Sequence, residues 1–340
     1  MGVTGFHSTD NPSPGLAIAR CLLEAGHQVI ALDYSPFSTG LHFDGIKHVV
    51  MLEKFDGNSE TYISNFVRAA TKVHVQVVIP SIDMEVRLLS QHLNEFEIHG
   101  IKVLVPSVNA LERSNKRSLG SLASDYNFNY PKTFVCVNLE DVKQSCNEIG
   151  FPCYLKSSVY EGDRVSKPDD IPYYVERLIT LWDWPILVQE AVEGEELGVA
   201  ALCGFDGKVV GSVQMKKIGI TDRGKTWAGV TIRDERISEL VNRILGAIKW
   251  VGGCELEFIR TPENKLFLLE INPRFPAWIF LTHLAHCNLP ALAVDLLQNQ
   301  HTGSAATDYH TGVAFARIAT EVEIHLSKTM QLQLEGEWQK

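Results

Sequence analysis

The stretch Cys254–Arg274 constrains the fold of this 340-residue chain more than any other. Two runs with alternating apolar and polar residues, CELEFIR and LFLLEINPR, flank the polar segment TPENK, which is typical of a β-hairpin. We place the centre of the turn between Glu263 and Asn264, and in that register Glu257 faces Glu270. Because side chains alternate between the two faces of a strand, the apolar residues share one face and the acidic residues the other.

The acidic face of this hairpin predicts a metal site. In the same register Glu255 faces Asn272. Like charges directly opposite each other destabilise a sheet, so facing carboxylates are sensible where they hold a cation. Carboxylate and amide oxygens suit Mg²⁺ or Mn²⁺ rather than zinc. We therefore expect Glu257, Glu270 and Asn272 to bind the metal, with Arg274 placed to neutralise a phosphate or an oxyanion. The alternative is an ordinary hairpin with an exposed acidic face.

The rest of the chain indicates α/β and α+β architecture. A short apolar run, a loop, a helical pattern ending at Gly26 and a buried run ending at Asp33 form a βαβ unit, which implies a parallel sheet. Helix and strand patterns continue to alternate as far as CYLKS. From residue 197 a period of two dominates, and the pair Asp206-Gly207 marks a second hairpin. We expect domain boundaries near residues 110 and 190.

Charge and composition exclude several classes of protein. The net charge is −10 and the chain has no basic stripe, so we expect no nucleic-acid partner. No apolar stretch reaches the roughly 20 residues of a membrane helix, and the N-terminus lacks a signal-peptide pattern, so we expect no membrane association. The seven cysteines are dispersed and form no CxxC pair, which argues against a zinc ribbon and favours reduced thiols in the cytoplasm.

The motif ELEF…LLEINPR resembles the metal-binding strands of the ATP-grasp superfamily, particularly its carbamoyl-phosphate-synthetase-like branch. The resemblance covers residues 1–320. It implies a Rossmann-like pre-ATP-grasp domain without NAD at residues 1–110, followed by a two-lobed ATP-grasp fold. The small lobe is expected at residues 111–190 and the C-terminal lobe, with the metal site, at 191–325. Residues 326–340 are expected to form a tail.

The resemblance also implies an ATP site. Lys116 and Lys156 resemble the two lysines that contact phosphates, and LVQEAVEGEELGV resembles the hinge that holds adenine. The expected hinge contacts are the side chain of Gln189, the backbone of Glu190 and Val192, and the ribose-binding carboxylate of Glu196.

Two features depart from the family pattern. Many relatives carry Glu where this hinge has Gln189, which changes a side-chain contact to adenine. The loop SSVYEGDRV after Lys156 has a single glycine, Gly162, instead of a pair. Of the adjacent acids Glu195 and Glu196, the second is chosen for its position in the motif.

The sequence positions of the two lysines also bear on phosphate binding without the resemblance. Lys156 ends an apolar strand, where a desolvated cation needs an anionic partner, whereas Lys116 on its own could be an ordinary surface lysine. The segment 219–226, GITDRGKT, satisfies the P-loop pattern, but the following WAGVTI predicts a strand where a P-loop requires a helix. We interpret this segment as a loop over the phosphates. Lys216, Lys217 or Lys225 could contact them there, and Lys217 is assigned to the ATP site.

The function that the resemblance implies is an ATP-dependent carboxylate–amine ligase. It would activate a carboxylate as an acyl phosphate, form an amide and release ADP and phosphate, with Arg274 and Lys156 as catalytic residues. The partners would be a small carboxylate and an amine, with an amino acid or a peptide as one of them. A homodimer is compatible with the sequence. The alternatives are a carboxylase that uses bicarbonate and a non-catalytic ATP-binding regulator.

Two acidic residues of the first domain complete the expected site. Asp83 and Glu85 follow a strand end, where ligands of α/β sheets bind, and are expected to face the amino group of a substrate. A helix N-cap at Asp83 explains that residue equally well.

Overall fold

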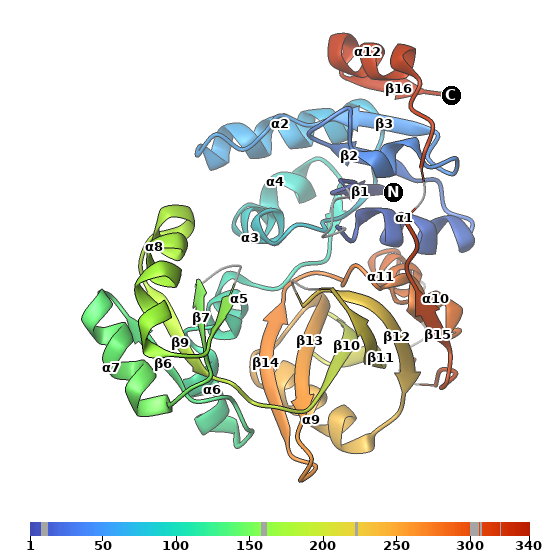
Figure 1. Ribbon diagram of the computed structural model, residues 1–340. Helices are drawn as coiled ribbons and strands as arrows, with labels where there is room; N and C mark the ends of the chain where they lie inside the picture. Colours follow the sequence, from blue (N-terminus) through green and yellow to red (C-terminus); the bar gives the residue numbers. More distant parts are fainter. Residues whose placement is uncertain (8–12, 158–161, 222–223, 300–305, 307, 320) are drawn as a thin grey trace. The chain divides into compact units, whose positions relative to one another are not determined.

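The structure is a computed structural model that describes residues 1–7, 13–157, 162–221, 224–299, 306, 308–319 and 321–340 (Figure 1). Parts of three expected loops, after Gly5, after Lys156 and in the P-loop-like segment, lie outside these residues. The chain divides into two compact units. The larger unit comprises Met1–Ala110, Gly198–Glu255 and Asn272–Lys340, and the smaller unit comprises Leu111–Leu197 and Leu256–Ile271. Each unit is described by itself below.

A six-stranded sheet in the N-terminal part of the larger unit has the strand order β16-β3-β2-β1-β4-β5. Its strands are β1 (Gly2–Thr4), β2 (Ile30–Asp33), β3 (His48–Met51), β4 (Val77–Ile79), β5 (Lys102–Val103) and β16 (Glu337–Gln339). The strands from β1 to β5 pair in parallel, for example Gly2 with Ile30, as the βαβ pattern predicted. Such pairs require crossover connections, and helices supply them.

The helices of this region are amphipathic and bury one face. They are α1 (Gly15–Glu24), α2 (Ser59–Lys72), α3 (Asp83–Gln91) and α4 (Leu93–Ile98), with the short 3-10 helix η1 (Thr39–His42) between β2 and β3. In α1, Ile18 and Leu22 are fully buried one helical turn apart. The α2 helix begins after Asn58, whose side chain accepts a hydrogen bond from Thr61 N at 3.0 Å.

The expectation of a C-terminal tail at residues 326–340 is wrong. These residues form α12 (Leu326–Glu335) and β16, which pairs antiparallel with β3 at the edge of the sheet (Figure 1). Glu337 lies 2.9 Å from His48 and 2.7 Å from Lys72. The Nζ of Lys328 donates to Leu41 O at 2.7 Å and lies 3.9 Å from the ring centroid of Trp338. A three-residue edge strand has too little apolar periodicity to be recognised locally.

A second six-stranded sheet has the order β14-β13-β10-β11-β12-β15. Its strands are β10 (Glu195–Cys203), β11 (Val209–Ile220), β12 (Thr226–Ile232), β13 (Gly252–Arg260), β14 (Leu266–Asn272) and β15 (Ala314–Ala316), and the accompanying helices are α9 (Glu235–Ala247), α10 (Phe280–Leu284) and α11 (Leu289–Leu297). The Asp206-Gly207 turn is confirmed, with Gly207 at φ +77°. The strand β12 confirms the prediction for WAGVTI and excludes a P-loop, which would need a helix there.

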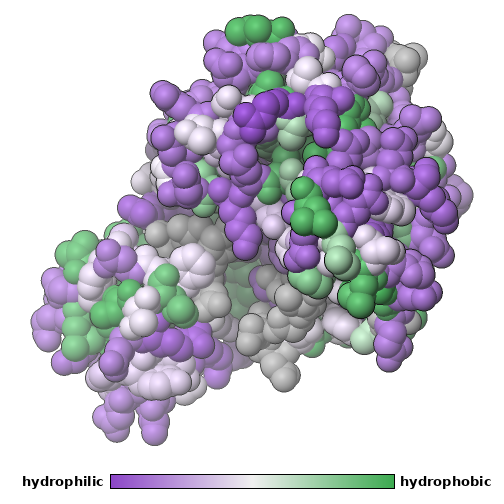
Figure 2. Space-filling view, turned by 90° about the horizontal axis from the view of Figure 1, so that it is seen from above, coloured by the Kyte–Doolittle hydropathy of each residue, from purple (hydrophilic) through white to green (hydrophobic). Residues whose placement is uncertain are grey.

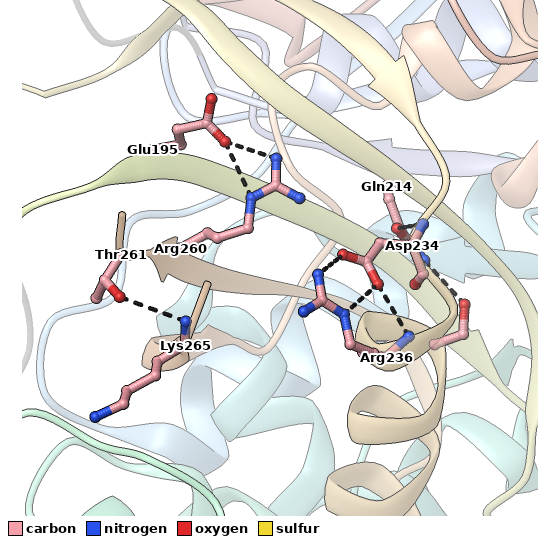
Figure 3. Close-up of polar contacts among 8 residues, drawn as sticks. Glu195, Gln214, Asp234, Arg236, Arg260, Thr261 and Lys265 are labelled. Atoms are coloured by element: carbon pink, nitrogen blue, oxygen red, sulfur yellow. Dashed lines mark hydrogen bonds and ion pairs between the residues drawn. The ribbon is translucent and has the colours of Figure 1, made fainter. Parts of the chain in front are cut away.

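The turn of the acidic hairpin differs from the expected one by half a residue. Thr261 N donates to Lys265 O at 2.9 Å, so the three-residue loop is centred on Glu263. Asn264 takes the left-handed conformation with φ +65°, as the third residue of such loops does. Lys265 N also donates to the Thr261 hydroxyl at 3.4 Å (Figure 3). Next to the turn, Thr261 is therefore paired with Lys265, which differs by one residue from the pairing that the sequence predicted.

The smaller unit is built on a four-stranded antiparallel sheet with the order β6-β9-β7-β8. The strands are β6 (Thr133–Cys136), β7 (Cys153–Ser157), β8 (Gly162–Val165) and β9 (Ile186–Glu190). The helices in this part of the chain are α5 (Val108–Ser114), α6 (Leu119–Tyr126), α7 (Leu139–Ile149) and α8 (Ile171–Trp182), with the 3-10 helix η2 (Pro168–Asp170) before α8. Val142, Leu155 and Leu178 are fully buried in its core.

The described surface and cysteines agree with the composition. Figure 2 shows one face on which hydrophilic residues predominate and hydrophobic ones form small separate groups. All seven cysteines are free and buried. Among the described residues, no helix has the length and apolar character needed to cross a membrane.

Candidate functional site

Two expected site residues form an ion pair in the smaller unit. Lys116 lies in the turn before α6, and its Nζ is 2.9 Å from Oε2 of Glu270 in β14. The Lys116 and Glu270 side chains are 17% and 24% exposed. Burial opposes a charged Lys116, but Glu270, together with Glu257, outweighs it and raises the pKa of the lysine. Lys116 therefore stays protonated beside two of the expected metal ligands.

The second expected lysine lies in the same unit. Lys156 in β7 pairs with Gly162 of β8 and Leu187 of β9, and its Nζ donates to Oε1 of Gln189 at 2.7 Å. Burial and then the charge of Lys116 lower the pKa of Lys156 to about 8, against the opposing effects of nearby carboxylates. Those carboxylates belong to Glu270, Glu257 and Glu196. The smaller unit thus gathers two lysines and three acids that the sequence had singled out.

The hinge segment follows β9. Glu190 N donates to Lys132 O at 2.9 Å, and the Glu190 carboxylate accepts from Lys132 N at 3.1 Å. The amide of Glu190 is therefore already used. Val192 N, two residues further on, has no acceptor among the residues that the structure describes. An amide without an acceptor can donate to a ring nitrogen of adenine.

The two adjacent hinge acids have different environments. Glu195 is held by Arg260, with distances of 3.0 Å to Nε and 2.6 Å to Nη2 (Figure 3). Glu196 acts on Lys156 instead. Because neighbouring residues of a strand point to opposite faces, this division supports Glu196 as the acid on the side of the lysines.

In the larger unit, Arg274 joins residues from distant parts of the chain. Its Nε lies 3.1 Å from Oδ1 of Asp83, and its Nη1 lies 3.4 Å from Oε2 of Glu255. Glu255 is 5% exposed and accepts from Trp278 Nε1 at 2.6 Å. The structure therefore brings together Asp83 and Arg274, the expected substrate residues.

The expected metal ligands offer oxygen atoms, the donors that divalent cations such as Mg²⁺ prefer. Asn272 donates its Nδ2 to Oε2 of Glu255 at 3.2 Å, which turns its Oδ1 away from that carboxylate. Glu257 and Glu270 both act on the Lys116 ammonium, so a cationic group is already favoured beside them. Within the described ranges, no cluster of three or more His, Cys, Asp or Glu residues could hold a metal. The expected set of ligands contains two Glu residues and one Asn residue, so it is not a cluster of this kind.

Two interpretations of the first domain need correction. Ile82, not Asp83, is the N-cap of α3, and no side chain caps the helix. Glu85 is fully buried, and its carboxylate accepts hydrogen bonds from the hydroxyls of Thr4 and Tyr34. Burial raises the pKa of Glu85 to about 7. A carboxylate enclosed in this way serves the packing of the domain and is closed to a substrate amine.

Sequence reasoning missed Arg317, which follows β15. Its Nη2 donates to Ala277 O at 2.8 Å and its Nε to Thr226 O at 3.2 Å. Among the described residues Arg317 has no carboxylate partner, and burial lowers its pKa. Carbonyl oxygens orient a guanidinium without cancelling its charge. The signal was an arginine in the otherwise apolar run VAFARIA. Lys217, in β11, is partly exposed.

Comparisons with known proteins identify relatives of parts of this chain. A family model described as ATP-grasp in the biosynthetic pathway with Ter operon matches residues 183–321. The carbamoyl phosphate synthase large chain of Agathobacter rectalis is 29% identical over 147 residues, or 40% of this chain and 14% of that protein. The formate-dependent phosphoribosylglycinamide formyltransferase of Bacteroides thetaiotaomicron is 24% identical over 228 residues, or 61% of this chain and 56% of that protein. The chain thus spans only part of these relatives.

Solved structures share the fold at low sequence identity. The biotin carboxylase domain of Hydrogenobacter thermophilus 2-oxoglutarate carboxylase, crystallised with MgADP, ADP and bicarbonate, has a TM-score of 0.69 at 15% identity, covering 90% of this chain and 71% of that one. N5-carboxyaminoimidazole ribonucleotide synthetase from Thermus thermophilus has a TM-score of 0.66 at 18% identity, with coverages of 90% and 80%. The hairpin motif and the family model agree, and residues 183–321 of this chain match an ATP-grasp family.

Proposed function

We propose that the protein is an ATP-dependent carboxylate–amine ligase that forms an amide through an acyl phosphate and releases ADP and phosphate. The observation that carries this proposal is the Lys116–Glu270 pair, in which a phosphate-type lysine lies 2.9 Å from a metal-type carboxylate. A site for a metal-bound polyphosphate needs both kinds of group close together, because the lysine binds the anion and the acid binds its cation.

The nucleotide would bind along the smaller unit. Its adenine would meet the carbonyl of Glu190 and the amide of Val192, and its ribose would meet Glu196. Lys156 and Lys116 would bind phosphate oxygens, and Lys217 would add positive charge from β11. Mg²⁺ or Mn²⁺ held by Glu257, Glu270 and Asn272 would neutralise charge on the β- and γ-phosphates.

The reaction would proceed in two steps. A substrate carboxylate attacks the γ-phosphorus, the bond to ADP breaks, and the lysines stabilise the transferred charge. An amine then attacks the acyl phosphate, and phosphate leaves. Arg274, held by Asp83 and Glu255, is oriented to stabilise the tetrahedral oxyanion. Arg317 supplies a second guanidinium for the substrate carboxylate. Both steps need positioned charge and no covalent nucleophile from the protein.

An ADP-release screen tests the proposal. The purified protein is mixed with Mg-ATP and pools of amino acids, short peptides and small carboxylates, with Glu270→Ala alongside. ADP release that depends on a pool and vanishes in the variant is expected. Tight ATP binding without release from any pool would instead favour a non-catalytic nucleotide-binding regulator.

Bicarbonate is the competing carboxylate, because one structure with the same fold was crystallised with it. The screen therefore includes a pool with ¹⁴C-labelled bicarbonate. Acid-stable incorporation of the label would show a carboxylase, whereas an unlabelled amide product would show the ligase.

A further inference from the structure

Gln189 occupies a buried position directly before the hinge. It lies in β9 and is 2% exposed, with Thr133 of β6 and Tyr154 of β7 as its partners on the two neighbouring strands. Both ends of its amide are engaged. Nε2 donates to the Thr133 hydroxyl at 2.9 Å, and Oε1 accepts from Lys156 Nζ at 2.7 Å.

The direction of these hydrogen bonds is determined by a backbone carbonyl. The Thr133 hydroxyl donates to Pro131 O at 2.8 Å, and a carbonyl oxygen can only accept. The single proton of Thr133 is therefore used, and its oxygen must accept from the amide nitrogen of Gln189. This places the amide oxygen of Gln189 on the side of Lys156, whose ammonium can only donate.

The same partners exclude the opposite orientation of the amide. An inverted amide would place its NH₂ group against the Lys156 ammonium, which also only donates.

We propose that Thr133 and Gln189 form a positioning pair that holds the Lys156 ammonium through one neutral oxygen and leaves its charge for a nucleotide phosphate. This inference rests on the proposed ATP site. A carboxylate in place of Gln189 would also hold the ammonium, but it would compensate the charge and compete with the phosphate. The neutral amide therefore orients the Lys156 ammonium without neutralising its charge.

Binding of ADP and of adenosine to three variants tests the pair. Thr133→Val removes the acceptor that orients Gln189, and about a tenfold loss of ADP affinity is expected with adenosine affinity unchanged. Thr133→Ser restores the acceptor and is expected to restore ADP binding. Gln189→Glu pairs with Lys156 and is expected to weaken ADP binding. ADP is measured by calorimetry and adenosine by ligand-observed NMR, all at pH 7.

The matched control is Thr180→Val, which removes a hydroxyl that donates to Glu176 O on α8. It is expected to leave both affinities unchanged, and melting temperatures confirm that each variant is folded. Equal losses of affinity for ADP and adenosine in Thr133→Val, or no loss of ADP affinity in either Thr133→Val or Gln189→Glu, would overturn the positioning role. A wild-type protein that binds no ADP would overturn the proposed nucleotide site itself.

Discussion

The Nζ of Lys116 lies 2.9 Å from Oε2 of Glu270, and Glu257 acts on the same ammonium. The lysine comes from the turn before α6 and the acid from β14, so the fold brings together two charges that are far apart in the sequence. The pair links the residues expected to bind phosphate with those expected to bind metal. The first prediction follows from this link.

Glu270→Ala is expected to lower the rate of substrate-dependent ADP release by about 10²–10³-fold, because it removes charge that acts on the transferred group. It also leaves the Lys116 ammonium without its nearest carboxylate, so the melting temperature is measured alongside to show that the variant is folded. Glu263→Ala is the matched control, because Glu263 lies in the exposed turn of the same hairpin. Comparable losses of rate in both variants would contradict the assignment.

Nucleotide affinity is expected to fall as the pH rises above about 8. The pKa of Lys156 is lowered to about 8, and a bound phosphate favours the ammonium form. Above that pH the free protein has lost this proton and must take it up on binding, so the dissociation constant should rise by up to about tenfold per pH unit.

Titration of ADP binding between pH 7 and pH 9.5 measures this effect. Lys156→Arg keeps its charge throughout the range and should give a flatter profile. Lys143→Arg, at an exposed position of α7, should follow the wild type. A wild-type profile without a slope above pH 8 would show that Lys156 takes up no proton on binding.

The stability of the larger unit is expected to decrease between about pH 4.5 and pH 7 because of Glu85. Its pKa in the folded chain is raised from 4.5 to about 7, chiefly by burial. The folded chain keeps this proton up to a higher pH than the unfolded chain, so the contribution is fully present below pH 4.5 and is lost as the pH rises through 7. The contribution is on the order of 3 kcal/mol.

Melting temperatures of Glu85→Gln and wild type at pH 5 and pH 8 check this effect. The variant should gain relative to wild type at pH 8, because its amide has no charge to bury. Glu97→Gln, at an exposed position of α4, is the control and should show the wild-type difference between the two pH values. A variant that loses as much stability as wild type on going to pH 8 would exclude Glu85 as the cause.

Gly162→Ala is expected to weaken ADP binding while the protein remains folded. A Cβ at this position would lie 2.7 Å from Cγ of Lys156, so the lysine side chain would have to move from its place beside Gln189. Gly246→Ala in α9 is the control, because a Cβ there meets no atom within 4 Å and alanine favours a helix. Calorimetry with ADP would contradict the prediction if both variants bound as wild type.

Local features of this fold could be predicted because they depend on neighbouring residues in the chain. The βαβ opening, the Asp206-Gly207 hairpin and the strand β12 follow from hydrophobic periodicity and turn residues. The strand β16 could not be predicted, since it exists through its pairing with β3. Asp83 was open to two interpretations because an acid after a strand can cap a helix or face the amino group of a ligand.

The sequence by itself determined which residue types carry the chemistry, because alternation along each strand of the hairpin separates polar from apolar side chains. Only the tertiary structure decided their partners. Whether Glu85 is enclosed, whether Glu195 or Glu196 acts on Lys156, and which way the Gln189 amide points all depend on burial and on donors from distant segments. Hydrogen bonds and ion pairs act over a few ångströms in space, so separation along the chain does not predict them.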